Sequence, residues 1–126
     1  MLVGAVEEPI VLVDARNVIR SRWPNLEEQW FLERCRAWAD REGVRAQVVF
    51  DGRAPAWADD DRMTVAGAGS VIADDVIAKE AAKLAGEGRR VWLVTSDRGL
   101  RARAAPDAER TIGGGTFAGV LERLPP

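Results

Sequence analysis

The chain has 126 residues, 30% of them charged, and a net charge of −2, which fits one soluble domain over residues 1–126 and does not by itself indicate a nucleic-acid binder. It contains no His, no Tyr and one Cys, which excludes Ser-His-Asp and Cys-His catalysis, His-ligated metals and an internal disulfide. No apolar run is long enough to cross a membrane, and the N-terminal segment with Glu7 and Glu8 lacks the basic region of a signal peptide.

Apolar runs bounded by acids or turn residues predict the strands. The first run, IVLV, is β-branched and aliphatic throughout, which is typical of a central strand buried on both faces. The later runs follow at intervals that leave room for helices between most of them. The predicted strands, in chain order, cover residues 10–13, 46–50, 63–66, 91–95 and 111–112.

Two longer helices are predicted between these strands. Asn25, with Glu28 three residues later, resembles a capping box that opens the first helix, and Gly43 is expected to end it. Asp74 and Asp75 are expected to open the second helix, one of them as a cap and as a favourable charge at the positive helix end.

Two shorter helices complete the pattern. One is expected to bury Leu100 and Ala104, and Thr116 is expected to cap the last. The glycine run at 113–115 is interpreted as a flexible turn, because its spacing does not match a phosphate-binding loop. Strands that alternate with helices predict an α/β three-layer sandwich with a mostly parallel central sheet of four to five strands.

Acids end three of the predicted strands, at Asp14, Asp51 and Asp97. Ligands of open parallel sheets bind beyond the carboxyl ends of the strands, so these acids converge on one crevice, and Asp74 joins them if its helix begins at the same edge. Clustered carboxylates repel one another unless a cation lies between them, and Mg²⁺ or Mn²⁺ prefers such oxygen ligands. Without any His, this pattern indicates metal-assisted phosphoester chemistry.

The chain resembles the NYN and YacP-like nucleases of the PIN-like superfamily in four blocks that occur in the same order. These blocks are VLVDARNVI, VVFDG, ADDVIAKEA and VWLVTSDRGLRARA, and the resemblance extends over roughly residues 10–121. It implies a PIN-like, Rossmann-like fold and a metal-dependent endoribonuclease that uses Mg²⁺ or Mn²⁺. The implied substrate is RNA, and the lone cysteine suits a cytoplasmic protein.

Carried over by position, the resemblance implies that Asp14, Asp74 and Asp97 are metal ligands and catalytic residues. Asn17 is implied to orient the first ligand or to contact substrate, and Ser96 is implied to line the site. Asp51 is implied to line the site as well and is a further candidate ligand, although it equally fits a simple turn. Asp75 is a weaker candidate ligand, because it lies about 100° around the helix from its neighbour.

Two positions depart from the family pattern. Ala15 replaces the usual glycine after the first acid, which is a mild change. Gly99 stands where many PIN domains carry a further acid, and this argues against a second, tightly held metal ion.

Arginines and tryptophans supply candidate RNA contacts. Arg98 and Arg101 share one helix face if their segment is helical, and with Arg16 they are expected to form a cationic lip; solvated surface arginines are the alternative. Trp23 and Trp57 stand in polar loops, where each either stacks on bases or is buried under the loop.

Two rival functions are left open. One is a PIN-like module that binds RNA or protein without cleaving. The other is a doubly wound phosphotransfer or nucleotide-binding module, such as a receiver-like domain. The residues after Asp14 argue against the receiver-like form, since they are Ala15 and Arg16 and not acids. No DNA-binding motif is evident, and the sequence leaves open both a homo-oligomer and a protein partner.

Overall fold

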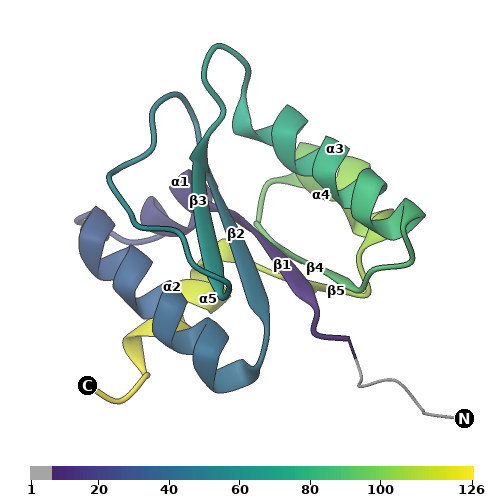
Figure 1. Cartoon of the computed structure of the whole chain (residues 1–126). Coiled ribbons are helices and arrows are strands. Elements are labelled where there is room, and N and C mark those ends of the chain that lie inside the picture. The colour runs from purple at the N-terminus through teal and green to yellow at the C-terminus, as the bar shows by residue number, and fades with distance from the viewer. Residues whose placement is uncertain (1–6) are drawn as a thin grey trace, which may run out of the picture.

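The computed structural model describes residues 7–126, so most of the N-terminal segment considered for a signal peptide lies outside the described residues. Within them, no helix combines the length and the apolar character that a membrane crossing requires. The elements run, in chain order, β1 (Ile10–Asp14), α1 (Ala15–Ile19), α2 (Glu28–Glu42), β2 (Arg45–Phe50), β3 (Met63–Gly67), α3 (Ala73–Gly86), β4 (Val91–Val94), α4 (Arg98–Ala104), the 3-10 turn η1 (Ala105–Asp107), β5 (Arg110–Ile112) and α5 (Gly114–Glu122) (Figure 1).

All five strands are parallel and lie in the order β3-β2-β1-β4-β5, which confirms the predicted sheet. The chain starts at the centre, moves outward through β2 and β3, and then crosses back to place β4 on the other side of β1. The strand order therefore reverses between β1 and β4. This is the Rossmann-type order, whereas receiver-like sheets have the order 2-1-3-4-5, so the receiver-like alternative is wrong.

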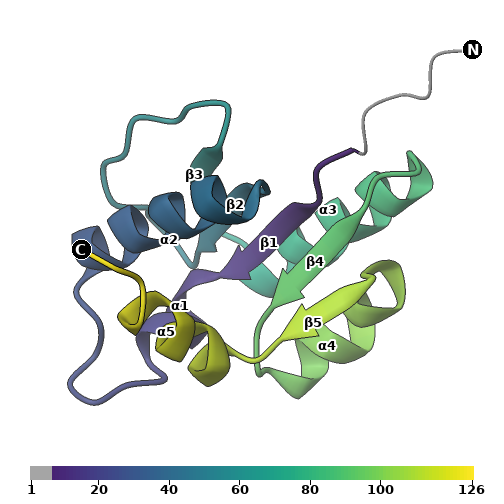
Figure 2. The same cartoon turned by 90° about the horizontal axis from the view of Figure 1, so that it is seen from below.

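Helices cover both faces of the sheet and make the three layers expected from the sequence. In Figures 1 and 2, α2 and α5 lie on one face, and α3 and α4 lie on the other. The central strand contributes to both cores, because its side chains alternate. Val11 and Val13 pack with α2 and α5, whereas Ile10 and Leu12 pack with α3 and α4.

Several helix boundaries differ from the prediction. The capping box at Asn25 is wrong, because α2 begins at Glu28 and its N-cap is Glu27, whose carboxylate accepts a hydrogen bond from the Trp30 amide at 2.6 Å. The predicted end at Gly43 is confirmed, and this glycine adopts the left-handed conformation with φ of 67°. The five-residue helix α1, directly after Asp14, was not predicted.

The start of the last helix differs from the prediction as well, because this helix begins earlier than expected. Thr116 is not its cap, because α5 starts at Gly114 and Gly113 is the N-cap residue. The glycine run is therefore not a flexible turn: it follows β5 directly and forms the first turn of α5. Helix propensity does not predict this arrangement, because glycine is a poor helix former. Glycine is needed here because the start of α5 packs closely against another part of the fold.

Candidate active site

A pocket of about 390 Å³ opens at the carboxyl edge of the sheet, where the strand order reverses. Four aspartates and five other polar residues line it: Asp14, Asp51, Asp74, Asp97, Arg16, Asn17, Arg20, Ser21 and Ser96. The acids come from the ends of three strands and the first turn of α3, so the structure brings together the acids that were expected to converge. Their catalytic roles stay predictions.

Asp14 is the deepest of the four acids. Its side chain is only 6% exposed, at the end of the central strand. The hydroxyl of Thr95, which is itself fully buried, donates a hydrogen bond to Asp14 Oδ2 at 2.8 Å. Asp14 is also the N-cap residue of α1, but its side chain makes no capping hydrogen bond. Asp14 is therefore held by its position at the end of β1 and by Thr95, the residue that follows β4.

Thr95 connects two of the acids. Its oxygen accepts a hydrogen bond from the Asp97 amide at 3.1 Å while its hydroxyl donates to Asp14. Asp97 Oδ1 in turn accepts from the Leu100 amide at 2.8 Å and caps α4. The helix cap and the site residue are thus one side chain. The importance of Thr95 was missed, although a polar residue that ends a buried strand is a readable signal.

Asp51 positions the helix that carries Asp74. Its Oδ1 accepts a hydrogen bond from the Ala73 amide at 2.8 Å. The N-cap residue of α3, Ile72, has no capping side chain of its own, so Asp51 satisfies this helix end from the neighbouring strand. The contact holds the first turn of α3 against the sheet edge and places Asp74 in the pocket.

Asn17 and Ser96 form a clamp that joins α1, the β4–α4 loop and α5. Asn17 Oδ1 accepts a hydrogen bond from the Ser96 amide at 2.8 Å, and Ser96 Oγ accepts one from the Gly114 amide at 2.8 Å. Gly114 packs so closely that a β-carbon there would overlap Asn17 Oδ1. The side-chain oxygens of Asn17 and Ser96 therefore hold the site together. We call Asn17, Ser96 and Gly114 the clamp.

The arginines are placed differently from the expected lip. Arg101 Nε donates to the Thr95 carbonyl at 2.8 Å, and Arg98 is exposed at the start of α4; neither lines the pocket. Arg16 does line it and pairs with Glu28 at 3.0 Å. The other arginine at the pocket is Arg20, which is exposed.

Arg20 and Ser21 were not among the predicted site residues. A short helix after Asp14 would have revealed both, because they lie four residues after Arg16 and Asn17. Five residues are too few for the periodicity that marks a helix in a sequence.

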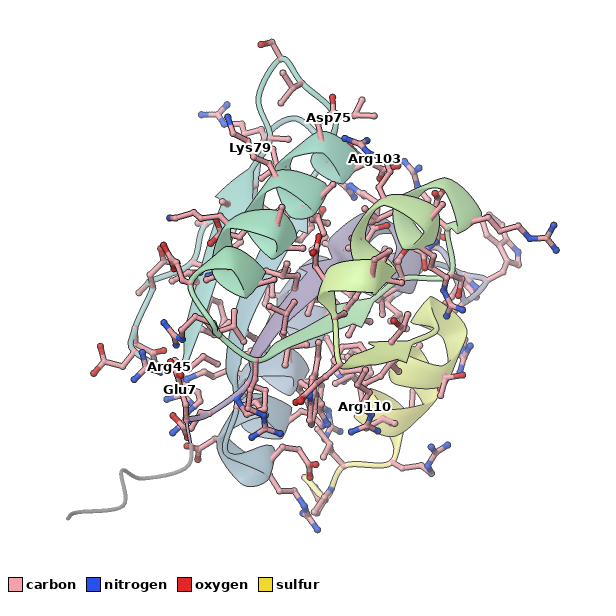
Figure 3. The ribbon with its side chains drawn as sticks, turned by 90° about the vertical axis from the view of Figure 1, so that its right-hand side faces the viewer. Glu7, Arg45, Asp75, Lys79, Arg103 and Arg110 are labelled. Carbon is pink, nitrogen blue, oxygen red and sulfur yellow. The ribbon has the colours of Figure 1, made fainter. Side chains whose placement is uncertain are left out.

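Asp75 is turned away from the pocket. Its carboxylate pairs with Arg103 of α4 at 2.8 Å, and the two side chains lie side by side in Figure 3. The structure therefore separates Asp75 from the other acids, as expected for a residue one step around the helix from Asp74.

Burial and mutual repulsion raise two carboxyl pKa values. The pKa of Asp14 is raised to about 6, mainly by burial and further by Asp74 and Asp51, against the lowering effect of the Thr95 hydrogen bond and of the nearby Asn17 backbone amide. Burial also raises the pKa of Asp74, with further contributions from Asp97 and Asp51. Each acid thus disfavours the charge of its neighbours.

The donors suit a hard cation, although they do not form a closed cage. Carboxylate oxygens are the preferred ligands of Mg²⁺ and Mn²⁺, and a cation would relieve the repulsion that raises the pKa of Asp14 and Asp74. Within residues 7–126, no three Asp, Glu, His or Cys side chains are close enough together to hold an ion by themselves. The pocket therefore fits an ion held by one or two carboxylates that keeps much of its water shell, the usual mode for Mg²⁺.

The pKa of Asp14 predicts how stability depends on pH. The folded pKa of about 6 lies above the ordinary value of 3.8, so the folded state binds this proton more tightly than the unfolded chain. The resulting loss of folding free energy is absent below about pH 4 and grows as the pH rises to about 6. Above that pH it levels off at up to roughly 3 kcal/mol. We expect urea unfolding, with a chelator present, to show Asp14→Asn gaining stability relative to the parent across this range.

The comparison of Asp14→Asn with the parent protein contains its own control. Carboxyl groups with lowered pKa values, such as Glu8 and Asp60, are present in both and cancel in the difference. A difference that stays constant between about pH 4 and pH 7 would show that Asp14 does not titrate as the structure indicates.

The clamp predicts opposite effects for two adjacent glycines. Gly114→Ala should destabilise the fold by roughly 2 kcal/mol, because the added methyl group overlaps Asn17. Gly115→Ala is the matched control: its nearest neighbouring atom is 3.8 Å from the new β-carbon, so the better helix propensity of alanine should leave stability equal or slightly higher. Thermal unfolding measures both, and equal melting temperatures would contradict the close packing.

Comparisons with known proteins find a similar fold. No protein-family model matches the chain, and no curated protein matches it in sequence. Two crystal structures of Rae1 (YacP) from Bacillus subtilis, the first of a single-substitution mutant, superpose with TM-scores of 0.71 and 0.69 at 22% identity. They cover 90% of this chain and 75% and 73% of their own chains. The chain therefore has a YacP-like fold.

Proposed function

We propose that this chain is a metal-dependent ribonuclease that hydrolyses RNA phosphodiester bonds. The observation that carries the proposal is the pocket in which four aspartates meet at the strand-order reversal of a YacP-like fold. RNA is the substrate implied by the NYN and YacP-like motifs of the sequence. A slightly acidic protein can still bind a polyanion when a cation occupies its acidic centre.

The four acids divide into ligands and a positioning residue. Asp14, Asp74 and Asp97 are the candidate ligands of Mg²⁺ or Mn²⁺: one or two of them would bind the ion directly and the others through its water shell, with Asp97 using the oxygen that does not cap α4. One carboxylate oxygen of Asp51 accepts a hydrogen bond from the start of α3, so the main role of Asp51 is to position Asp74. When bound, the ion would polarise the phosphate and lower the pKa of a coordinated water. Thr95 keeps Asp14 oriented toward the pocket through its hydrogen bond.

Arg16 and Arg20 are the cations placed to bind the RNA backbone. Both line the pocket beside the acids, one at the start of α1 and one directly after it. Arg16 is steadied by Glu28 and by the ring of Phe50, 5.3 Å from its guanidinium carbon. Guanidinium groups bind phosphate oxygens in pairs, so this side of the pocket is the proposed entry for the substrate backbone.

The second candidate function is an RNA-binding module that does not cleave. It is favoured by one observation, that no three acidic side chains within the described residues close around an ion. Both candidates predict RNA binding, but only the ribonuclease predicts cleavage that depends on a divalent metal.

Two neighbouring aspartates provide a matched test of cleavage. Asp74→Asn should lower the rate of RNA cleavage by roughly a hundredfold or more, because it removes a charge from the pocket. Asp75→Asn alters the next residue, whose partner is Arg103, and should leave the rate nearly unchanged. The measurement is cleavage of a fluorescent RNA in Mg²⁺ or Mn²⁺, with the same preparations assayed in a chelator.

Three results would count against the ribonuclease. They are equal loss in both variants, full activity of Asp74→Asn, and cleavage that persists in the chelator. The absence of any cleavage by well-folded protein would favour the non-cleaving module.

Metal binding can be tested without catalysis. An ion that binds only the folded state stabilises it by about 2.7 kcal/mol at a concentration of 100 times its Kd. We therefore expect Mn²⁺ to raise the melting temperature of the parent and of Asp75→Asn. Asp14→Asn should lose most of this rise, because its buried carboxylate is the central ligand. An equal rise in Asp14→Asn would place the ion elsewhere.

A further inference from the structure

Trp23 is an exposed aromatic residue close in sequence to Arg20 and Ser21, which line the pocket. Its indole is 91% exposed, whereas Trp38 is buried and the other three tryptophans are half-buried. Trp23 lies in the loop between α1 and α2, two residues after Ser21. A fully exposed tryptophan forgoes the burial that the residue normally gains in folding, so a binding role accounts for its position better than packing does.

The loop holds Trp23 in a defined place. On one side, the Ser21 hydroxyl and amide both donate to the Val18 carbonyl, at 2.6 and 3.1 Å. On the other, the Leu26 amide donates to the Ile19 carbonyl at 3.1 Å. The indole is therefore displayed on a closed loop that is tied back to α1, and little order is lost when a ligand binds to it.

Arg22, next to Trp23, anchors the same loop to α5. Its guanidinium pairs with Glu122 at 3.0 Å and donates to the Gly115 carbonyl at 3.2 Å. Arg20 and Arg22 thus differ in their surroundings. Arg22 is bound to α5, whereas Arg20 is exposed and lines the pocket.

The neighbours of Trp23 favour a nucleic-acid base over a protein surface. Trp23 has Arg22 on one side and only the small ring of Pro24 on the other, and the other exposed large hydrophobic residues, Val71 and Ile72, belong to the β3–α3 loop. A single aromatic face beside a cation and a polar pocket is the arrangement that binds single-stranded nucleic acid. The α-carbons of Ser21 and Trp23 are at most about 7 Å apart, so a base next to a phosphate at the pocket can reach the indole.

We propose that Trp23 is a stacking platform for an unpaired base of an RNA whose backbone passes Arg20 into the aspartate pocket. This inference rests on the proposed ribonuclease function and narrows its substrate to single-stranded RNA, because a base inside a duplex has no free face to offer. Trp23 is a substrate-binding residue in this scheme and takes no part in the chemistry.

Binding is tested by fluorescence anisotropy of a short single-stranded RNA and of its duplex, with Ca²⁺, another cation that prefers oxygen ligands, in place of Mg²⁺. Gel analysis after each titration checks that the RNA is intact. Trp23→Ala should weaken the single-stranded complex by about fivefold to a hundredfold, and Trp23→Phe should restore most of the affinity. The matched control is Val71→Ala, which also shortens an exposed hydrophobic side chain but should change nothing. Duplex affinity should be the same in all these proteins.

Salt dependence separates stacking from charge. Trp23→Ala should leave the slope of log affinity against log salt unchanged, because the indole contacts no phosphate. Arg20→Ala should reduce that slope by about 0.7, the value for one phosphate contact on a single strand. Melting temperatures should stay equal, since both side chains are exposed.

Unchanged single-stranded affinity in Trp23→Ala overturns the inference, as does an equal loss for duplex and single strand. Reduced self-association with unchanged RNA affinity would also overturn it and make Trp23 a protein contact. Cleavage in Mg²⁺ or Mn²⁺ is a separate readout. If the chain does not cleave but Trp23-dependent binding persists, the ribonuclease proposal fails alone; if it cleaves and Trp23→Ala leaves both KM and affinity unchanged, this inference fails alone.

Discussion

The burial of a carboxylate at the end of the central strand is the constraint on which the rest of the site depends. Asp14 is nearly inaccessible, and its charge is opposed by the surrounding apolar core and by two neighbouring acids. A fold tolerates such a group only where hydrogen bonds or a cation compensate for it. Thr95 supplies a hydrogen bond, and the open pocket leaves room for a cation.

The remaining acids illustrate how one side chain can serve the fold and the site together. Asp97 caps α4, and Asp51 satisfies the first turn of α3 from the neighbouring strand. Each helix is thereby drawn to the sheet edge by an acid that also contributes to the negative potential of the pocket. Substitution of either residue consequently alters helix geometry as well as charge, so loss of activity in such a variant does not identify a ligand. Asp74 is the more informative position, because the acid beside it faces elsewhere.

The strands, their parallel arrangement and the acids that follow them could be predicted from local patterns. A buried aliphatic run such as 10–13 is typical of a central strand in an α/β protein, and the residues that follow parallel strands meet at one edge of the sheet. Helix starts could not be predicted in this way. Glu27 takes the place of Asn25 as the cap and accepts from the Trp30 amide, and the glycines of α5 are helical because Gly114 must fit against Asn17. The side of the pocket that holds arginines was also misplaced, since Arg101 satisfies a carbonyl of the same loop. These outcomes depend on contacts between distant segments, which periodicity does not contain.

The hydrogen bonds that close the pocket have a consequence for when it forms. Thr95 and Asp14 are 81 positions apart, and Ser96 and Asn17 are 79 apart. Contacts of such sequence separation form late, because the intervening chain must first be ordered. During synthesis, β1 leaves the ribosome long before β4 and α5, which hold its acid and its clamp in place. A nascent chain therefore carries the aspartate without the site, and the pocket is completed only once the sheet has closed around its first strand.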